Sequence, residues 1–240
     1  MQSVSGKPDL RVERKELKYC IPYKEYVVLS GLLRKILKQD IHNRTKLKGY
    51  FVRSLYFDTL DNKSFEEKTA GIEERTKYRL RIYDNAKWVK FEIKNKFNNC
   101  VVKETAIISR EDAAEIQNMN YEVMLKYNDK VLNKIYKEFK KHAYYPVVLL
   151  DYLREAFVYD LNSIRIVFDK FLKSTTLQLD IFKKDTFQTQ KLKQGLVIME
   201  IKYNGFIPGF LKQILQIPSF EMDAISKYCI GRLDYFESTV

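Results

Sequence analysis

Charged and apolar residues alternate along many segments of this chain, and this alternation constrains its fold more than any other feature. From Lys77 to Ile82, every second residue is Lys or Arg, and the residues between them are Tyr, Leu and Ile. Alternate side chains of an extended strand point to opposite faces, so one face of this strand is cationic and the other is apolar. The pattern returns at Lys90–Lys94, Ser163–Asp169 and Ile198–Lys202. A period of two predicts a sheet with one buried face.

Other segments add helices to this sheet. The segments with the clearest alternation, which we predict to be strands, are Tyr50–Asp58, Lys77–Tyr83, Trp88–Lys94, Val101–Ile108, Val147–Ala156, Ile164–Asp169 and Leu196–Tyr203. The segments with apolar residues at helical spacing, which we predict to be helices, are Pro22–Leu37, Tyr121–Phe139, Pro208–Ile214 and Met222–Leu233. The chain has only 8 glycines and 5 prolines, and no linker-like stretch divides it. We therefore expect residues 1–240 to form a single α+β domain around one large antiparallel sheet.

The apolar stripes of the predicted helices need a partner, and the apolar strand faces are the obvious one. If the helices cover those faces from outside, the charged faces point inward. We therefore expect a closed antiparallel β-barrel tunnel with helices packed outside, although periodicity alone does not distinguish an open sheet from a barrel. Charges inside such a tunnel must be balanced by a ligand, a metal ion or counter-charges.

The composition points to an anionic partner in a reducing compartment. The 43 Lys and Arg residues outnumber the 31 Asp and Glu residues, which gives a formal charge of +12. The cysteines Cys20, Cys100 and Cys229 are too few and too widely spaced for a disulfide framework or a zinc pattern. Only two histidines are present, so a catalytic constellation based on histidine is disfavoured. Met1–Glu16 has no apolar signal core and no run is long enough to span a bilayer, so we expect a cytoplasmic protein.

Side chains would have to hold any phosphate, because the chain contains no glycine-rich phosphate loop. Arginine binds phosphate oxygens with a planar fork, and lysine adds a compact charge. Glu16, Glu92 and Glu200 each stand two residues before a lysine and are candidate ligands for Mg²⁺ or Mn²⁺. Each of them would otherwise pair with a neighbouring lysine. Any single charged strand face is more often simply solvated, but Arg and Lys recur on several strands, which favours a bound polyanion.

Eight short motifs, spread over nearly the whole chain, resemble one known family. They are Arg14–Tyr19 (RKELKY), Ser54–Thr59 (SLYFDT), Lys77–Tyr83 (KYRLRIY), Phe91–Lys94 (FEIK), Tyr152–Phe157 (YLREAF), Ile164–Asp169 (IRIVFD), Met199–Lys202 (MEIK) and Ser226–Tyr228 (SKY). In this order they resemble the VTC domain, the polyphosphate polymerase domain of the vacuolar transporter chaperone family, which is one of the triphosphate tunnel metalloenzymes. Arg14 stands where the wider superfamily has its first acidic residue, which favours the polymerase branch over the hydrolases.

The resemblance implies a function as well as a closed tunnel. A protein of this family would transfer the terminal phosphoryl group of ATP to a growing polyphosphate chain with Mn²⁺ or Mg²⁺ and release ADP. Phosphate-binding and catalytic roles would fall to Lys18, Arg79, Arg81, Lys94, Arg154, Arg165 and Lys227. Further substrate contacts would come from Lys103, Tyr152, Lys202 and Ser226. The metal ligand would be Glu200, with Glu16 and Glu92 as additional candidates.

Three other functions remain open on the sequence. A tunnel that positions water would hydrolyse tripolyphosphate or nucleoside triphosphates, and a module without turnover would bind polyphosphate as a sensor or scaffold. A nucleic-acid partner is disfavoured, because the aromatic residues mostly lie away from the basic strand faces. Coupling to a membrane would require a separate membrane partner, which would hold the chain at the membrane periphery. A lysine group at Lys183, Lys184, Lys191 and Lys193 is either solvated surface or a place for product handling or membrane docking.

Overall fold

The structure is a computed structural model, and it describes residues 14–43, 49–84, 86–97, 100–215 and 225–237. One antiparallel sheet lies at its centre, with the strand order β1-β10-β8-β7-β3-β4-β5-β6. Its long strands are β1 (Arg14–Pro22), β3 (Tyr50–Asp58), β4 (Arg75–Tyr83), β5 (Val89–Phe97), β6 (Cys100–Ile108), β7 (Tyr145–Tyr159), β8 (Ile164–Thr175) and β10 (Leu196–Asn204). Two short strands, β2 (Lys38–Gln39) and β9 (Thr189–Gln190), pair with β7 and β8. All seven strands expected from the alternation are confirmed, with ends that shift by a few residues.

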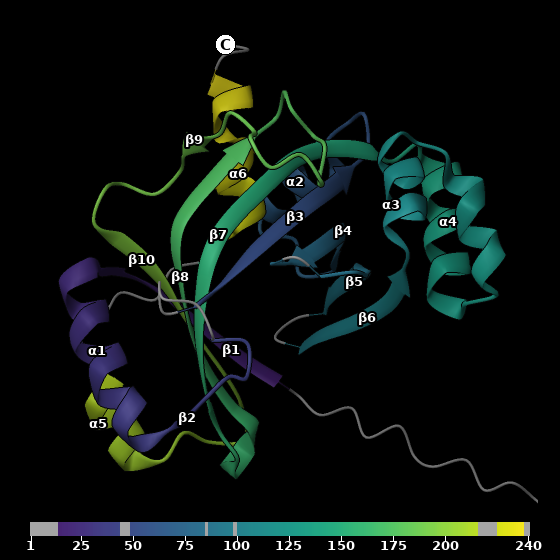
Figure 1. Cartoon of the computed structure of the whole chain (residues 1–240). Coiled ribbons are helices and arrows are strands. Elements are labelled where there is room, and N and C mark those ends of the chain that lie inside the picture. Colours follow the sequence, from purple (N-terminus) through teal and green to yellow (C-terminus); the bar gives the residue numbers. More distant parts are fainter. Residues whose placement is uncertain (1–13, 44–48, 85, 98–99, 216–224, 238–240) are drawn as a thin grey trace, which may run out of the picture.

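The sheet curls into an open half-barrel and does not close (Figure 1). Its edge strands β1 and β6 approach each other, yet no backbone pairing joins them within the described residues. Instead, Lys94 on β5 reaches Glu16 on β1 at 3.4 Å. Lys18 stands on one edge strand and Lys103 on the other, and lysine on an edge strand disfavours pairing with a further strand. The expected closed barrel is therefore wrong, although the charged face does lie inside the curve.

Two groups of helices cover the convex face of the sheet (Figure 1). Helices α3 (Arg110–Gln117) and α4 (Lys130–His142), with the 3-10 helix η1 (Tyr121–Tyr127), share a core with β3 to β6. Helices α1 (Tyr23–Ile36) and α5 (Gly209–Leu215) share a second core with β1, β8 and β10. A short 3-10 turn, η2 (Leu161–Ser163), connects β7 to β8. Burial of these apolar faces, at about 25 cal/mol per Å², stabilises the curl of the sheet.

The single helix expected over Tyr121–Phe139 is divided into two. Asn128 adopts a left-handed conformation with φ 45°, which ends η1. Asp129 then begins α4, because its carboxylate accepts the backbone N–H groups of Val131 and Leu132 at 2.8 and 3.0 Å. An Asn-Asp pair is a recognisable stop and start signal, and it overrides the continuous apolar spacing.

Helices α2 (Lys63–Thr69) and α6 (Lys227–Glu237) lie on the concave side, which corrects the expectation that all helices pack outside. Tyr228 of α6 packs against Tyr56 of β3, with ring centroids 5.3 Å apart. A Cβ at Gly231 would lie 2.5 Å from the side chain of Leu150, so α6 sits directly on β7. Residues 222–224 of the expected C-terminal helix lie outside the described residues. None of the described helices combines the length and apolar character needed to cross a membrane.

Candidate functional site

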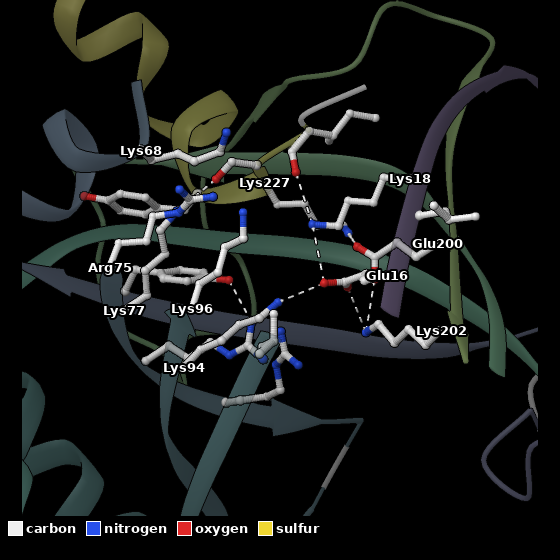
Figure 2. A pocket seen from close by; sticks show the side chains of 18 of the residues that line it. Glu16, Lys18, Lys68, Arg75, Lys77, Lys94, Lys96, Glu200, Lys202 and Lys227 are labelled. Atoms are coloured by element: carbon white, nitrogen blue, oxygen red, sulfur yellow. Dashed lines mark hydrogen bonds and ion pairs between the residues drawn. The ribbon is translucent and has the colours of Figure 1, made fainter. Parts of the chain in front are cut away.

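The concave face of the half-barrel holds a cavity of about 590 Å³ (Figure 2). Strands β1, β3, β4, β5, β6, β7 and β10 and helices α2 and α6 supply its walls. Its cationic lining residues are Lys15, Lys18, Lys68, Arg75, Lys77, Arg79, Arg81, Lys94, Lys96, Arg154, Lys202 and Lys227. Glu16 and Glu200 are the acidic lining residues, so the lining has a formal excess of ten positive charges. Asp169 and Glu92 pair with Arg154, Lys227 and Arg79 from beneath the lining, so twelve cations against four carboxylates leave an excess of eight, which is most of the formal +12 of the chain.

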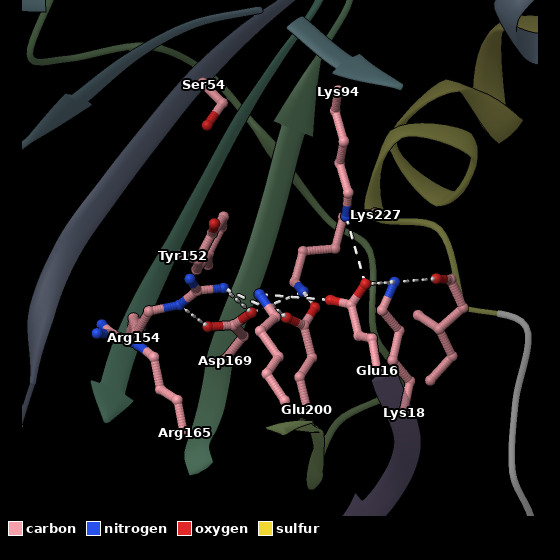
Figure 3. A network of polar contacts seen from close by, with 12 residues as sticks. Glu16, Lys18, Ser54, Lys94, Tyr152, Arg154, Arg165, Asp169, Glu200 and Lys227 are labelled. Atoms are coloured by element: carbon pink, nitrogen blue, oxygen red, sulfur yellow. Dashed lines mark hydrogen bonds and ion pairs between the residues drawn. The ribbon is translucent and has the colours of Figure 1, made fainter. Parts of the chain in front are cut away.

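A four-residue ion-pair network forms the floor of the cavity (Figure 3). Arg154 on β7 donates to both oxygens of Asp169 on β8, each at 2.7 Å. Lys227, at the start of α6, lies 2.6 Å from the same aspartate and also donates to Glu200 on β10. Burial opposes the charge on Lys227, but Asp169 and Glu200 outweigh it and raise the pKa of this lysine. Lys227 is therefore a fixed positive charge at neutral pH.

A second network joins Glu16 on β1 to Glu200 and Lys202 on the neighbouring β10, and its Lys94–Glu16 pair reaches across the opening between the sheet edges (Figure 2). The ammonium of Lys202 lies 3.3 Å from Glu16 and 3.2 Å from Glu200, so one cation bridges the two carboxylates. Burial would raise the pKa of Glu16, but Lys202, Lys94 and Lys18 lower it to about 2. Lys94 behaves differently, because burial outweighs its pairing with Glu16 and lowers its pKa to about 7. This lysine is consequently poised between its two protonation states at neutral pH.

Strand register sets the positions of the arginines on β4. Arg79 stands opposite Glu92 of β5 and Tyr56 of β3, and its guanidinium donates to them at 2.6 and 2.8 Å. Arg81, one step along the same face, donates to the Ser54 hydroxyl at 3.0 Å and to the Tyr152 hydroxyl at 3.1 Å. These bonds hold the planar guanidinium groups in fixed orientations. Fixed forks of this kind suit phosphate oxygens.

A cationic mouth, formed by Lys68, Arg75, Lys77 and Lys96, lies at one side of the cavity (Figure 2). Lys77 donates to the Ser226 hydroxyl at 3.0 Å, and burial lowers its pKa to about 8. The pKa of Lys68 is lowered by burial and by Arg75, and that of Lys96 by burial, Arg75 and Lys68. These neighbours destabilise one another's charge. A multiply charged anion would relieve that repulsion.

Eleven of the fourteen residues predicted from the sequence meet in this cavity. They are Glu16, Lys18, Arg79, Arg81, Lys94, Tyr152, Arg154, Glu200, Lys202, Ser226 and Lys227. The other three do not line it. Glu92 lies beneath Arg79 with its side chain 1% exposed, and Lys103 pairs with it at 3.2 Å. Arg165 pairs with Asp40 at 2.7 Å and donates to the Tyr50 hydroxyl at 3.1 Å.

Sequence reasoning missed several residues of the site. Lys77 and Lys96 share strand faces with Arg79 and Lys94, so the alternation contained a signal for both. Asp169, which holds Arg154 and Lys227, ends a motif that the resemblance singled out. The remaining misses are Lys15, Leu17, Tyr56, Lys68, Arg75, Val101, Tyr203, Ile225 and Tyr228. Lys68 lies on a helix, where no strand pattern points to it.

Comparison with known proteins identifies the family. The sequence profile of the VTC domain matches residues 13–236. This chain belongs to the VTC domain family. No curated protein matches the sequence of this VTC domain. A Hippeastrum protein studied as an adenylyl cyclase, and found to have a dominant triphosphatase activity, shares its fold. The match has 13% identity and a TM-score of 0.55, and it covers 91% of this chain and 95% of the Hippeastrum chain.

A second solved structure shares the fold of this VTC domain. It is a protein from Vibrio parahaemolyticus described as an adenylate cyclase, with 13% identity and a TM-score of 0.50. The match covers 91% of this chain and 97% of the Vibrio chain. At such low identities, the TM-scores show a shared fold alone. In this VTC domain the charged cavity lies on the concave face of that fold.

The chemistry of two cavity carboxylates fits the divalent cation that the family implies. Mg²⁺ and Mn²⁺ take oxygen ligands, and Mg²⁺ typically uses one or two carboxylates together with substrate phosphates. Glu16 and Glu200 already share one cation, the ammonium of Lys202. Within the part of the chain that the structure describes, no group of three His, Cys, Asp or Glu side chains converges on one point. Substrate oxygens would therefore complete the coordination of any metal at this pair.

Proposed function

We propose that this VTC domain is a metal-dependent polyphosphate polymerase that transfers the terminal phosphoryl group of ATP to a growing polyphosphate chain. One observation carries the proposal, namely that twelve cationic side chains line the cavity against four carboxylates, Glu16 and Glu200 in the lining and Asp169 and Glu92 beneath it. Each of the three phosphates of ATP has lost one strongly acidic proton near neutral pH, and the terminal phosphate loses a second with a pKa near 6. The triphosphate therefore carries roughly four negative charges. The cavity therefore has cationic capacity for a longer polyanion in addition to the nucleotide.

The side chains supply positioning and charge neutralisation, which are the main requirements of phosphoryl transfer. Arg79 and Arg154 are held by Glu92 and Asp169, so their forks are oriented before the substrate arrives. Lys227 keeps its charge beside them, whereas Lys94, with a pKa of about 7, is partly protonated at neutral pH, and a bound anion would increase its charge. The attacking group would be the end of the polyphosphate chain, and no covalent nucleophile is required.

Glu200 and Glu16 are the residues that would hold Mn²⁺ or Mg²⁺. When bound, the ion would neutralise charge on the phosphate oxygens. Both carboxylates stay ionised at neutral pH, because Lys202 and its neighbours lower their pKa values despite burial. Glu200→Gln would therefore leave nucleotide binding largely intact and abolish metal-dependent turnover. A fully active Glu200→Gln variant would contradict the metal assignment.

The direct test is to incubate the purified protein with ATP and Mn²⁺ or Mg²⁺, with and without a short polyphosphate primer, and to separate the products by gel. Long polyphosphate together with ADP is the expected result. Arg79→Ala and Lys227→Ala should each weaken nucleotide binding and lower product formation at least about tenfold, since each removes a charge-assisted phosphate contact. Lys137→Ala, on the exposed side of α4, is the matched charge control and should have full activity.

Hydrolysis of triphosphates is the second candidate, and it is favoured by the triphosphatase activity of the Hippeastrum protein that shares this fold. In the same assay, release of orthophosphate without polyphosphate would establish hydrolysis. Tight binding of tripolyphosphate without turnover would identify a sensor or scaffold.

A further inference from the structure

Two apolar side chains between β8 and β9 stand almost fully in solvent. Leu177 is 89% exposed and Phe187 is 77% exposed, and none of the other large apolar side chains in the described ranges is as exposed as either. The backbone of Phe187 reaches the residue that follows Leu177, because the N–H of Phe187 donates to the side chain of Gln178 at 3.2 Å. Figure 1 shows this segment as the green loop between β8 and β9, at the end of the half-barrel where α6 lies. We refer to residues 176–188 as the β8–β9 segment.

The β8–β9 segment is held firmly to the sheet by Arg53 of β3. This arginine is buried and donates to both oxygens of Asp151, at 2.8 and 2.6 Å. Its guanidinium also donates to the Thr186 hydroxyl at 3.1 Å and to the carbonyl oxygens of Ile181 and Lys183. One ion-paired arginine therefore fixes the backbone in the middle of the segment.

Other apolar side chains of the segment have partners inside the protein. Ile181 is fully buried in the core between β3–β6 and their helices, and Leu179 and Phe182 pack against that core. Packing of the segment therefore uses these three residues and leaves Leu177 and Phe187 outside. A rigid backbone holds these two apolar side chains in water. Their transfer to any apolar phase would lower the free energy.

We propose that the β8–β9 segment docks the protein on an anionic lipid bilayer, with Leu177 and Phe187 inserted at the boundary between headgroups and acyl chains. Lys183 and Lys184 are exposed on the segment beside Asp180 and Asp185, and Lys191 and Lys193 follow it in the chain, so residues 176–195 contain four lysines against two aspartates. Anionic headgroups attract such lysines, while the acyl boundary accepts the apolar side chains. Protruding side chains also suit lipid, which needs no matching groove, better than a protein partner, whose surface would need one.

Co-sedimentation of the full chain with phosphatidylcholine vesicles, with and without phosphatidylserine, tests this proposal. Excess tripolyphosphate should be present so that the cationic cavity does not bind headgroups. The protein should bind only the vesicles that contain phosphatidylserine. Leu177→Ser with Phe187→Ser should lower the partition coefficient between vesicles and water at least about tenfold, because both apolar side chains that would insert into the bilayer are lost. Lys183→Glu with Lys184→Glu should lower it as well and reduce its dependence on salt.

The matched control is Val28→Ser with Leu32→Ser, two exposed apolar residues on α1. This control variant should bind anionic vesicles as the unchanged protein does. The proposal is overturned if the unchanged protein ignores anionic vesicles, if the Leu177/Phe187 variant binds them fully, or if the α1 control loses binding equally. Thermal unfolding and tripolyphosphate binding of each variant, expected to be unchanged, separate a docking defect from a folding defect.

Discussion

Burial and charge compete residue by residue within the cavity. Glu16 and Lys94 form one ion pair, yet the outcome differs for the two groups: Glu16 has a pKa of about 2 and Lys94 one of about 7. Glu16 is surrounded by several cations, whereas Lys94, with 32% of its side chain exposed, is partly desolvated and has Lys18 and Lys202 as like-charged neighbours. The site is therefore short of negative charge until an anion binds.

Proton uptake should accompany the binding of tripolyphosphate. At pH 8, above the pKa of about 7, Lys94 is mostly neutral in the free protein, and a bound anion favours its ammonium form. Lys77, with a pKa of about 8, should contribute in the same direction. Calorimetric titration in two buffers of different ionisation enthalpy measures the uptake. Lys94→Met should reduce it, and an exposed-lysine variant, Lys137→Met, should not; identical heats in both buffers would refute the prediction.

Glu92 should be a major source of stability. Its carboxylate contacts Arg79 at 2.6 Å and lies 3.7 Å from Arg81, so Glu92→Gln leaves two buried arginines without this charge and should cost about 3 kcal/mol. The pKa of Glu92 is lowered because these arginines overcome the effect of burial. Its stabilisation is therefore present above the unfolded-state pKa of about 4.5 and is lost as pH falls through the folded-state value.

Urea unfolding at pH 7 and at pH 3 measures this contribution. Glu122→Gln, which removes one partner of an exposed ion pair with Lys140, is the control and should leave the free energy of unfolding nearly unchanged, because solvent screens the pair. Equal effects of the two substitutions at pH 7 would show that Glu92 is not a structural counter-charge.

Among the elements, α2 and α6 decide the shape of the site, and one aspartate joins them. Asp58 at the end of β3 is fully buried and accepts the backbone N–H groups of Ser64 and Phe65 in the first turn of α2, at 2.8 and 3.2 Å. It also accepts the hydroxyl of Tyr228 of α6. Negative charge at the start of α2 is favourable, so a single side chain stabilises the helix and holds α6 beside it. This arrangement positions the adjacent Lys227.

Displacement of α6 should disable the site. In Gly231→Val, the new Cβ would lie 2.5 Å from the end of the Leu150 side chain and 3.3 Å from that of Val148, both buried, so either these side chains repack or the helix shifts away from β7. We expect a stability loss of about 1–3 kcal/mol and a loss of tripolyphosphate binding of at least about tenfold, because Lys227 moves with the helix. Gly31→Ala on α1, where a Cβ would meet nothing within 4 Å, should be neutral or stabilising by up to about 1 kcal/mol. Thermal unfolding and calorimetry measure both variants, and unchanged binding in Gly231→Val would contradict this role of α6.

At the scale of the whole molecule, the charge distribution explains why the free protein should respond strongly to polyanions. Twelve cationic side chains line a cavity beside only two lining glutamates, within a sheet whose edges do not pair in the described residues. The resulting repulsion acts against the compact state until a ligand supplies negative charge.

Tripolyphosphate should therefore raise the thermal unfolding temperature by more than an equal concentration of orthophosphate does. At a ligand concentration of 100 times Kd, the expected stabilisation is about 2.7 kcal/mol. The shift should shrink steeply between low and high salt, because screening weakens the attraction. Differential scanning fluorimetry at several salt concentrations measures it. A shift that is independent of salt would argue against an electrostatic site.

The local pattern predicted most of the strands and most of the site, for a clear physical reason. Alternation directs Arg79, Arg81 and Lys94 to the same face as Lys202, and antiparallel pairing then brings these faces together. The misses have equally physical causes. Lys68 reaches the site from a helix, and Arg165 is drawn to Asp40, a residue distant in sequence. The alternation along the strands predicts neither contact.

The sequence by itself determined the family, the α+β class and the cationic face, because side-chain alternation and motif order are local properties of the chain. Only the tertiary structure decided that the sheet stays an open half-barrel, that α2 and α6 pack on its concave side, and which carboxylate neutralises which cation. Closure depends on whether two edge strands distant in sequence can pair against the charge they present. The placement of helices depends on which face of the sheet remains apolar after it curls, as at Leu150 beneath Gly231. Both are balances between surfaces that meet only in the folded protein.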